Sequence, residues 1–113
     1  MALSYYDKAL DIAQNIFGNN HPKTARVYES LGRFYGNRIE DIDQAIEYYN
    51  KGVEIYKNLL IEKNPTVAWM YLGMAGCYKY QGKDNVSNEY LEKGYEIYNA
   101  LGIRILQTDG TWK

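Results

Sequence analysis

Few residues of this chain could perform nucleophilic or acid–base chemistry. Among 113 residues there is one cysteine, Cys77, and one histidine, His21. A zinc protease motif needs two histidines, and a thiolate metal cluster needs several cysteines. His21 directly precedes Pro22, where a helix-capping role is expected. Cys77 has no basic cluster beside it in sequence to lower its pKa, and we expect a small buried or half-buried residue without a reactive role. We therefore predict no catalytic residue, no metal and no cofactor, and an enzyme is the function class with the least support.

One short segment superficially resembles a phosphate-binding loop. Gln81-Gly82-Lys83-Asp84 has the central Gly-Lys pair of that motif. The motif also needs a glycine five residues earlier and a Ser or Thr after the lysine. Those positions hold Cys77 and Asp84. We therefore predict no nucleotide site here.

The charge balance and the apolar pattern exclude other classes of partner. The formal net charge is −1, which creates no field that would attract nucleic acid or an anionic membrane. No stretch approaches the ~20 apolar residues that a membrane span needs. The first residues, Met-Ala-Leu-Ser, lack the basic and apolar regions of a signal peptide. The expectation is a cytoplasmic protein that binds neither nucleic acid nor membranes.

Apolar residues recur at helical spacing and predict five helices joined by short turns. The expected ranges are 2–17, 22–36, 41–61, 65–80 and 84–101. Pro22 and Pro65 fit the first turn of a helix, where a missing N–H costs nothing, and His21 and Asn64 precede them as caps. Asp41 or Asp43 is expected to cap the third helix.

One face of each helix is expected to point inward. The predicted inward residues are Tyr6, Ala9, Ile12, Ala13 and Ile16; Ala25, Tyr28, Leu31, Gly32 and Tyr35; Ala45, Tyr49, Gly52, Ile55 and Leu59; and Ala68, Tyr71, Met74, Ala75 and Tyr78. Glu54, Lys57, Glu62 and Lys63 are interpreted as a solvated helix face. A glycine inside a helix costs about 1 kcal/mol against alanine. Gly32, Gly52 and Gly94 on inward faces therefore predict close contacts between helices.

The helical pattern repeats. Shifting the chain by 43 residues places Tyr5 on Tyr48 and Pro22 on Pro65, and a shift of 42 then places Gly52 on Gly94. The second copy therefore has one extra residue in its turn, near Ile39. A fixed period of about 40 residues is the signature of a repeat protein.

The repeat resembles the tetratricopeptide repeat. The residues that carry the resemblance are Tyr28-x-x-Leu31-Gly32-x-x-Tyr35 followed by Ala45, Tyr49 and Gly52. The period and the helix starts at Pro22 and Pro65 are similar to the kinesin-light-chain type of this repeat. Gly52, Gly94, Ser87 and Leu91 depart from the usual residues. The resemblance implies an all-α fold: a right-handed α-solenoid of antiparallel helix pairs with about five helices.

The resemblance also implies a division of the chain. The repeat domain would span 2–102: the second helix of an incomplete repeat at 2–17, a full repeat at 22–61 and a full repeat at 65–102. The tail at 103–113 matches no repeat. We expect it to be partly extended and to pack on the last helix through Ile105 or Trp112.

In this family the first helices of the pairs line a concave groove that binds peptides. By register, the resemblance places Arg26, Arg33, Asn37, Trp69, Leu72, Lys79 and Tyr80 in that groove, with Glu29 and Gly76 beside them. Arg26 and Arg33 are seven residues apart on one helix face and could hold a peptide carboxylate. Trp69 could serve as an aromatic anchor. Alternatively, Glu29 could join Arg26 and Arg33 in an ordinary surface row of salt bridges.

The sequence therefore predicts a module for protein–protein interaction that binds a peptide or protein segment in its groove. The alternative is self-association, as a homodimer or by domain swapping. The first helix lacks its own partner, so the open repeat ends could meet another copy.

Overall fold

A computed structural model describes residues 2–37 and 39–102. This part of the chain consists of helices and turns, without strands. The helices are α1 (Ala2–Phe17), α2 (Pro22–Gly36), α3 (Ile42–Asn58), α4 (Pro65–Tyr80) and α5 (Asp84–Ala100), with one short 3-10 turn, Ile39–Asp41. The extra residue predicted near Ile39 falls at this turn. The predictions for residues 103–113, including Ile105 and Trp112, lie outside the described residues.

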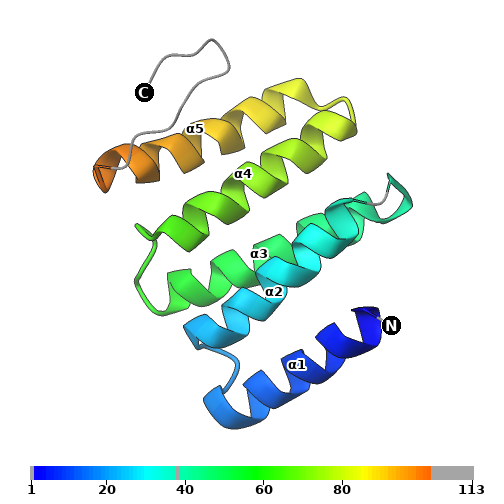
Figure 1. Cartoon of the computed structure of the whole chain (residues 1–113). Helices are drawn as coiled ribbons and strands as arrows, with labels where there is room; N and C mark the ends of the chain where they lie inside the picture. The colour runs from blue at the N-terminus through cyan, green and yellow to red at the C-terminus, as the bar shows by residue number, and fades with distance from the viewer. Residues whose placement is uncertain (1, 38, 103–113) are drawn as a thin grey trace.

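The helices follow one another in a stack (Figure 1). Contacts are most extensive within the pairs α2–α3 and α4–α5, and α3 packs on α4 to join the pairs. The first helices of the two pairs, α2 and α4, also touch. α1 contacts α2 at one end of the stack. The predicted all-α solenoid of helix pairs is confirmed.

The helix starts confirm the two capping predictions. His21 Nδ1 accepts a hydrogen bond from the Lys23 backbone N–H at 3.0 Å, and Asn64 Oδ1 accepts one from Thr66 N–H at 2.8 Å. Each cap satisfies a backbone donor that has no partner within the helix. Asp41 occupies the cap position of α3 without a capping side-chain bond.

The prediction that the third helix continues to residue 61 is wrong. α3 ends at Asn58, and the next turn closes with hydrogen bonds from Leu60 N–H to Lys57 O and from Ile61 N–H to Tyr56 O. These two bonds form a Schellman motif, which requires a left-handed residue between them. Leu60 takes that conformation, with φ of 60°. Glycine or asparagine usually marks this position, so the sequence carried no stop signal here.

The core is a layer of small, aliphatic and tyrosine side chains between the helices. Leu31, Val67, Met70 and Met74 are fully buried. A Cβ placed on Gly32 would lie 2.8 Å from the Tyr49 ring, and one on Gly94 would lie 2.8 Å from Leu72. These distances confirm that the inward glycines permit close helix contact.

The predicted inward face of α1 is only partly covered. Ala13 is buried, and Tyr6 and Ala9 are half-buried, but Ile12 and Ile16 are exposed. The prediction is wrong for these two isoleucines because they point away from α2, the described helix that α1 contacts. The equivalent Ile55 of α3 is buried by comparison.

Candidate functional site

A groove runs between α2 and α4, the first helices of the two pairs. Its hollow has a volume of about 310 Å³ and is lined by Arg33, Gly36, Asn37, Tyr49, Gly73, Gly76 and Cys77. Arg33, Asn37 and Gly76 were placed in the groove by register, whereas Tyr49 and Cys77 were expected away from it. Gly73 had no predicted place. The hollow therefore reaches from the surface of the stack down to its core.

Two stripes of residues follow the groove along its helices. Arg26, Ser30, Arg33 and Asn37 are spaced four, three and four apart on α2, and Trp69, Gly73, Gly76 and Tyr80 occupy the same spacing on α4. Residues at this spacing share one helix face. Trp69 and Tyr80 are 51% and 64% exposed. The α4 stripe therefore has an aromatic residue at each end and two glycines between them.

The two glycines have different surroundings. A Cβ on Gly73 would lie 2.6 Å from Tyr49 Cζ and 2.8 Å from its hydroxyl oxygen, so Gly73 makes room for the tyrosine that forms the floor. A Cβ on Gly76 would meet nothing within 4 Å among the described residues. A mid-helix glycine costs about 1 kcal/mol against alanine, and no packing contact among the described residues offsets that cost at Gly76.

The polar side of the groove is built on one ion pair. Arg33 Nε lies 2.8 Å from Glu29 Oε2, an i, i+4 contact on α2. Glu29 Oε2 is buried, and this contact lacks the geometry of a hydrogen bond. The structure therefore contains the Glu29–Arg33 part of the predicted row of salt bridges with Arg26. The contact uses the Nε side of the guanidinium, and the Arg33 side chain remains 57% exposed.

The Tyr49 hydroxyl at the floor remains protonated. Burial raises its pKa well above the usual value of 10.0, and the neighbouring Cys77 and Glu29 raise it further, while Arg33 opposes them. Burial also raises the pKa of the Cys77 thiol. The floor therefore offers a neutral hydroxyl and a neutral thiol, which suits hydrogen bonding to a ligand rather than nucleophilic attack.

The remaining predicted groove residues are more dispersed. Arg26 and Lys79 are exposed outside the hollow, as are Trp69 and Tyr80 at its ends. Leu72 is half-buried and faces α5, where its Cδ2 lies 2.8 Å from the Cβ position of Gly94. The structure thus brings Arg33 and Asn37 together and turns Leu72 toward the helix pair contact.

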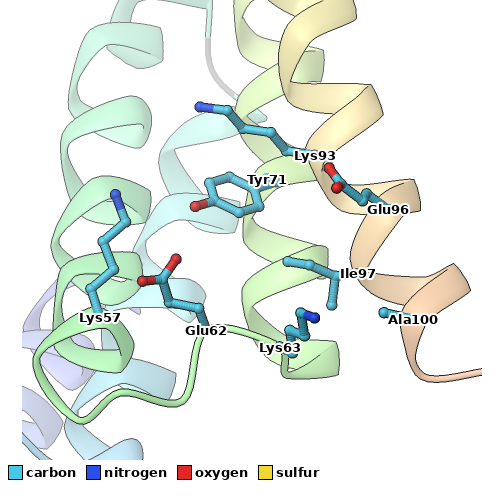
Figure 2. A pocket seen from close by; sticks show the side chains of 8 residues that line it. All are labelled: Lys57, Glu62, Lys63, Tyr71, Lys93, Glu96, Ile97 and Ala100. Atoms are coloured by element: carbon cyan, nitrogen blue, oxygen red, sulfur yellow. The ribbon is translucent and has the colours of Figure 1, made fainter.

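A second hollow of about 390 Å³ lies between the α3–α4 turn and α5 (Figure 2). Its lining is Lys57, Glu62, Lys63, Tyr71, Lys93, Glu96, Ile97 and Ala100. Figure 2 shows the Tyr71 ring between Lys57 and Glu62 on one side and Lys93 on the other. The interpretation of a solvated helix face is confirmed for Glu54 and Lys57, which are exposed on α3. Glu62 and Lys63 are exposed as well, but they lie in the turn after α3 and not on the helix. Charges of both signs surround the hollow, and they favour no single class of ligand.

Within residues 2–37 and 39–102, no group of three or more His, Cys, Asp or Glu side chains is placed to hold a metal ion. Among the same residues, no helix is long and apolar enough to cross a membrane.

Comparisons with known proteins agree with the repeat geometry. The model of the tetratricopeptide repeat family matches residues 1–58 and 34–100. BtubC (BKLC) from P. vanneervenii, a crystal structure, matches with a TM-score of 0.79 at 24% sequence identity. The match covers 89% of this chain and 40% of that chain, so the chain spans less than half of the solved structure. At this identity the likeness shows the fold alone. No curated protein matches the chain.

Proposed function

Because the chain belongs to the tetratricopeptide repeat family, we propose that the groove between α2 and α4 binds an extended segment of another protein. Tetratricopeptide repeats are in general protein-interaction modules, and no chemistry is assigned to the groove. The repeat region 2–102 would be the binding unit.

The observation that carries this proposal is Gly76. It lies mid-helix on the α4 stripe, and none of the residues that the structure describes fills the space beside it. A side chain there would fill the hollow without striking another described residue. The glycine therefore suits close approach of a ligand backbone to α4.

The dimensions and chemistry of the groove fit a short extended segment. Trp69 and Tyr80 are eleven residues apart, which is about 16 Å along a helix. An extended chain of about five residues covers that distance. The two aromatic side chains would contact apolar groups at its ends. The exposed part of the Arg33 guanidinium would bind a carboxylate or carbonyl, and the Asn37 amide a backbone group.

The test uses a displayed library of random peptides selected on the wild-type chain. Gly76→Leu places a side chain in the hollow, and Arg33→Ala removes the guanidinium. Asn50→Leu adds the same apolar bulk on an exposed position of α3 and is the control.

Selected peptides should bind Asn50→Leu as they bind the wild type and lose most binding to Gly76→Leu. A charged hydrogen bond contributes about 1.5–3 kcal/mol, so Arg33→Ala should weaken acidic peptides about 10- to 100-fold. Equal binding to all variants would remove the groove from the site.

Self-association through the open repeat ends is the second candidate. The exposed isoleucines of α1 favour it, because apolar side chains on one helix face gain stability when covered. Static light scattering over a range of concentrations decides it, since a mass that stays at the monomer value contradicts self-association.

A further inference from the structure

An apolar face of α1 is uncovered. Tyr5 and Ile16 are 70% and 67% exposed, and Ile12 between them is 57% exposed. Their spacing of seven and four residues places them on one helix face. This face is distinct from the groove between α2 and α4.

The repeat identifies what kind of interface this face belongs to. Forty-three residues later, Tyr48, Ile55 and Leu59 occupy the same positions on α3. Ile55 is buried, and Tyr48 and Leu59 are half-buried. α2 pairs with α3 there. The open face of α1 is therefore the counterpart of a surface that a first helix covers within the chain.

The α2–α3 pair shows how a first helix fills such a surface. Tyr28 and Tyr35 of α2, seven residues apart, both stack on Tyr48, with ring centroids at 6.1 and 5.6 Å. Lys51 Nζ lies 5.5 Å from the Tyr48 ring centroid and 5.9 Å from that of Tyr28. One turn away, a Cβ on Gly52 would lie 3.4 Å from the Ala25 carbonyl oxygen, so the two backbones come close.

The α4–α5 pair repeats the arrangement. Tyr71 and Tyr78 contact Tyr90 at 5.8 and 5.4 Å, and Lys93 Nζ lies 4.8 Å from the Tyr90 centroid. A Cβ on Gly94 would lie 3.1 Å from the Ala68 carbonyl oxygen. Both first helices therefore carry the pattern Ala-x-x-Tyr-x6-Tyr. Both second helices carry the complementary pattern Tyr-x-x-Lys-Gly.

α1 carries the second-helix half of this arrangement, and no described helix supplies the first-helix half against it. Tyr5 and Lys8 occupy the positions of Tyr48 and Lys51, and the small residue Ala9 occupies that of Gly52. We propose that the open face of α1 is a docking site for an α-helix of a partner protein with the pattern Ala-x-x-Tyr-x6-Tyr. The helix would lie against α1 as α2 lies against α3, with its two tyrosines on Tyr5 and an alanine at Ala9.

A second copy of this chain is a poorer occupant. Among the described residues both end helices, α1 and α5, are second helices, so two copies stacked end to end would still lack a first helix between them. A copy could supply one only by releasing its own α2 or α4, whose buried residues, including Leu31 and Met74, would then lose their contacts.

The test measures binding of a labelled peptide to the full chain by fluorescence anisotropy. The peptide is residues 22–36 of the chain itself, which carries Ala25, Tyr28 and Tyr35. Ile12→Glu introduces a charge at the centre of the α1 face, at an exposed position that the fold tolerates. Gln44→Glu adds the same charge to the exposed first turn of α3 and serves as its control.

The proposal predicts saturable binding of the peptide to the wild type and to Gln44→Glu. Ile12→Glu in the protein should weaken this binding at least tenfold. The double change Tyr28→Ser and Tyr35→Ser in the peptide should weaken it by at least as much. Equal binding to Ile12→Glu would overturn the proposal, because the peptide would then be displacing α2 inside the fold. No binding would also overturn it. So would a dimer of the chain that Ile12→Glu dissociates, since the occupant would then be a second copy.

Discussion

At the scale of single residues, two glycines inside helices differ in what surrounds them. Gly52 and Gly76 are both mid-helix, and the register places Gly52 on an inward face and Gly76 beside the groove. In the structure a Cβ on Gly52 would lie 2.6 Å from Met70 Sδ, whereas a Cβ on Gly76 would meet no described residue within 4 Å. The close contact at Gly52 followed from its inward register. The space at Gly76 depends on how α2 and α4 pack against each other, which no local pattern reveals.

Gly52→Leu should destabilise the fold by about 3 kcal/mol or more, because Met70 and the Ala25 backbone leave no room for a side chain. Gly76→Leu, the matched control, should leave stability unchanged or raise it by up to about 0.8 kcal/mol through helix propensity. Urea unfolding of both variants measures this. A Gly52→Leu chain as stable as Gly76→Leu would contradict the close-contact assignment.

At the scale of elements, helix starts were predictable and one helix end was not. His21-Pro22 and Asn64-Pro65 encode their starts locally, and the structure has both caps. The end of α3 has no such code, because a leucine occupies the left-handed position. Leu60 is 90% exposed, so its side chain contributes little packing that would offset this conformation.

Leu60→Gly should stabilise the chain by about 0.5–1 kcal/mol. A left-handed conformation costs an L-residue roughly 1–2 kcal/mol, and the greater freedom of glycine in the unfolded chain cancels part of the gain. Leu60→Ala keeps the same backbone penalty and should be close to wild type. Thermal unfolding of the three proteins is the measurement, and a Tm for Leu60→Gly at or below that of Leu60→Ala would show that the conformation carries no penalty.

At the scale of the whole molecule, the period of the repeat and its open ends were predicted from the sequence, whereas the exposure of Ile12 and Ile16 was not. The first helix of a pair is predicted by a local pattern, the spacing of Tyr28, Leu31 and Tyr35 within one helix. Ile12 carries the same apolar signal as Ile55, yet the described residues bury Ile55 and leave Ile12 exposed. Likewise, the comparison with the repeat family placed Leu72 in the groove, but its side chain packs against Gly94 of α5.

The tyrosine-rich core makes the stability of the whole fold depend on pH. Burial is the largest cause raising the pKa of Tyr48, Tyr49, Tyr71, Tyr78 and Tyr98 above 10.0, and it raises that of Cys77 above 9.0. Above these values the unfolded chain loses protons that the folded chain keeps. The unfolded state then binds fewer protons, so stability falls as pH rises.

The Tm should therefore be flat between about pH 7 and 8, begin to fall near pH 9 as the unfolded thiol ionises, and fall more steeply above pH 10. Near-ultraviolet absorbance of tyrosinate, followed with circular dichroism, measures ionisation and unfolding together. The buried tyrosines should ionise with the loss of helix, because their neutral form is held by the packing between helix pairs. Cys77→Ala should remove the fall in Tm that begins near pH 9 and leave the steeper fall in Tm above pH 10 unchanged. Ionisation of all tyrosines near pH 10 in a chain that stays helical would show that the layer between the pairs is open to water.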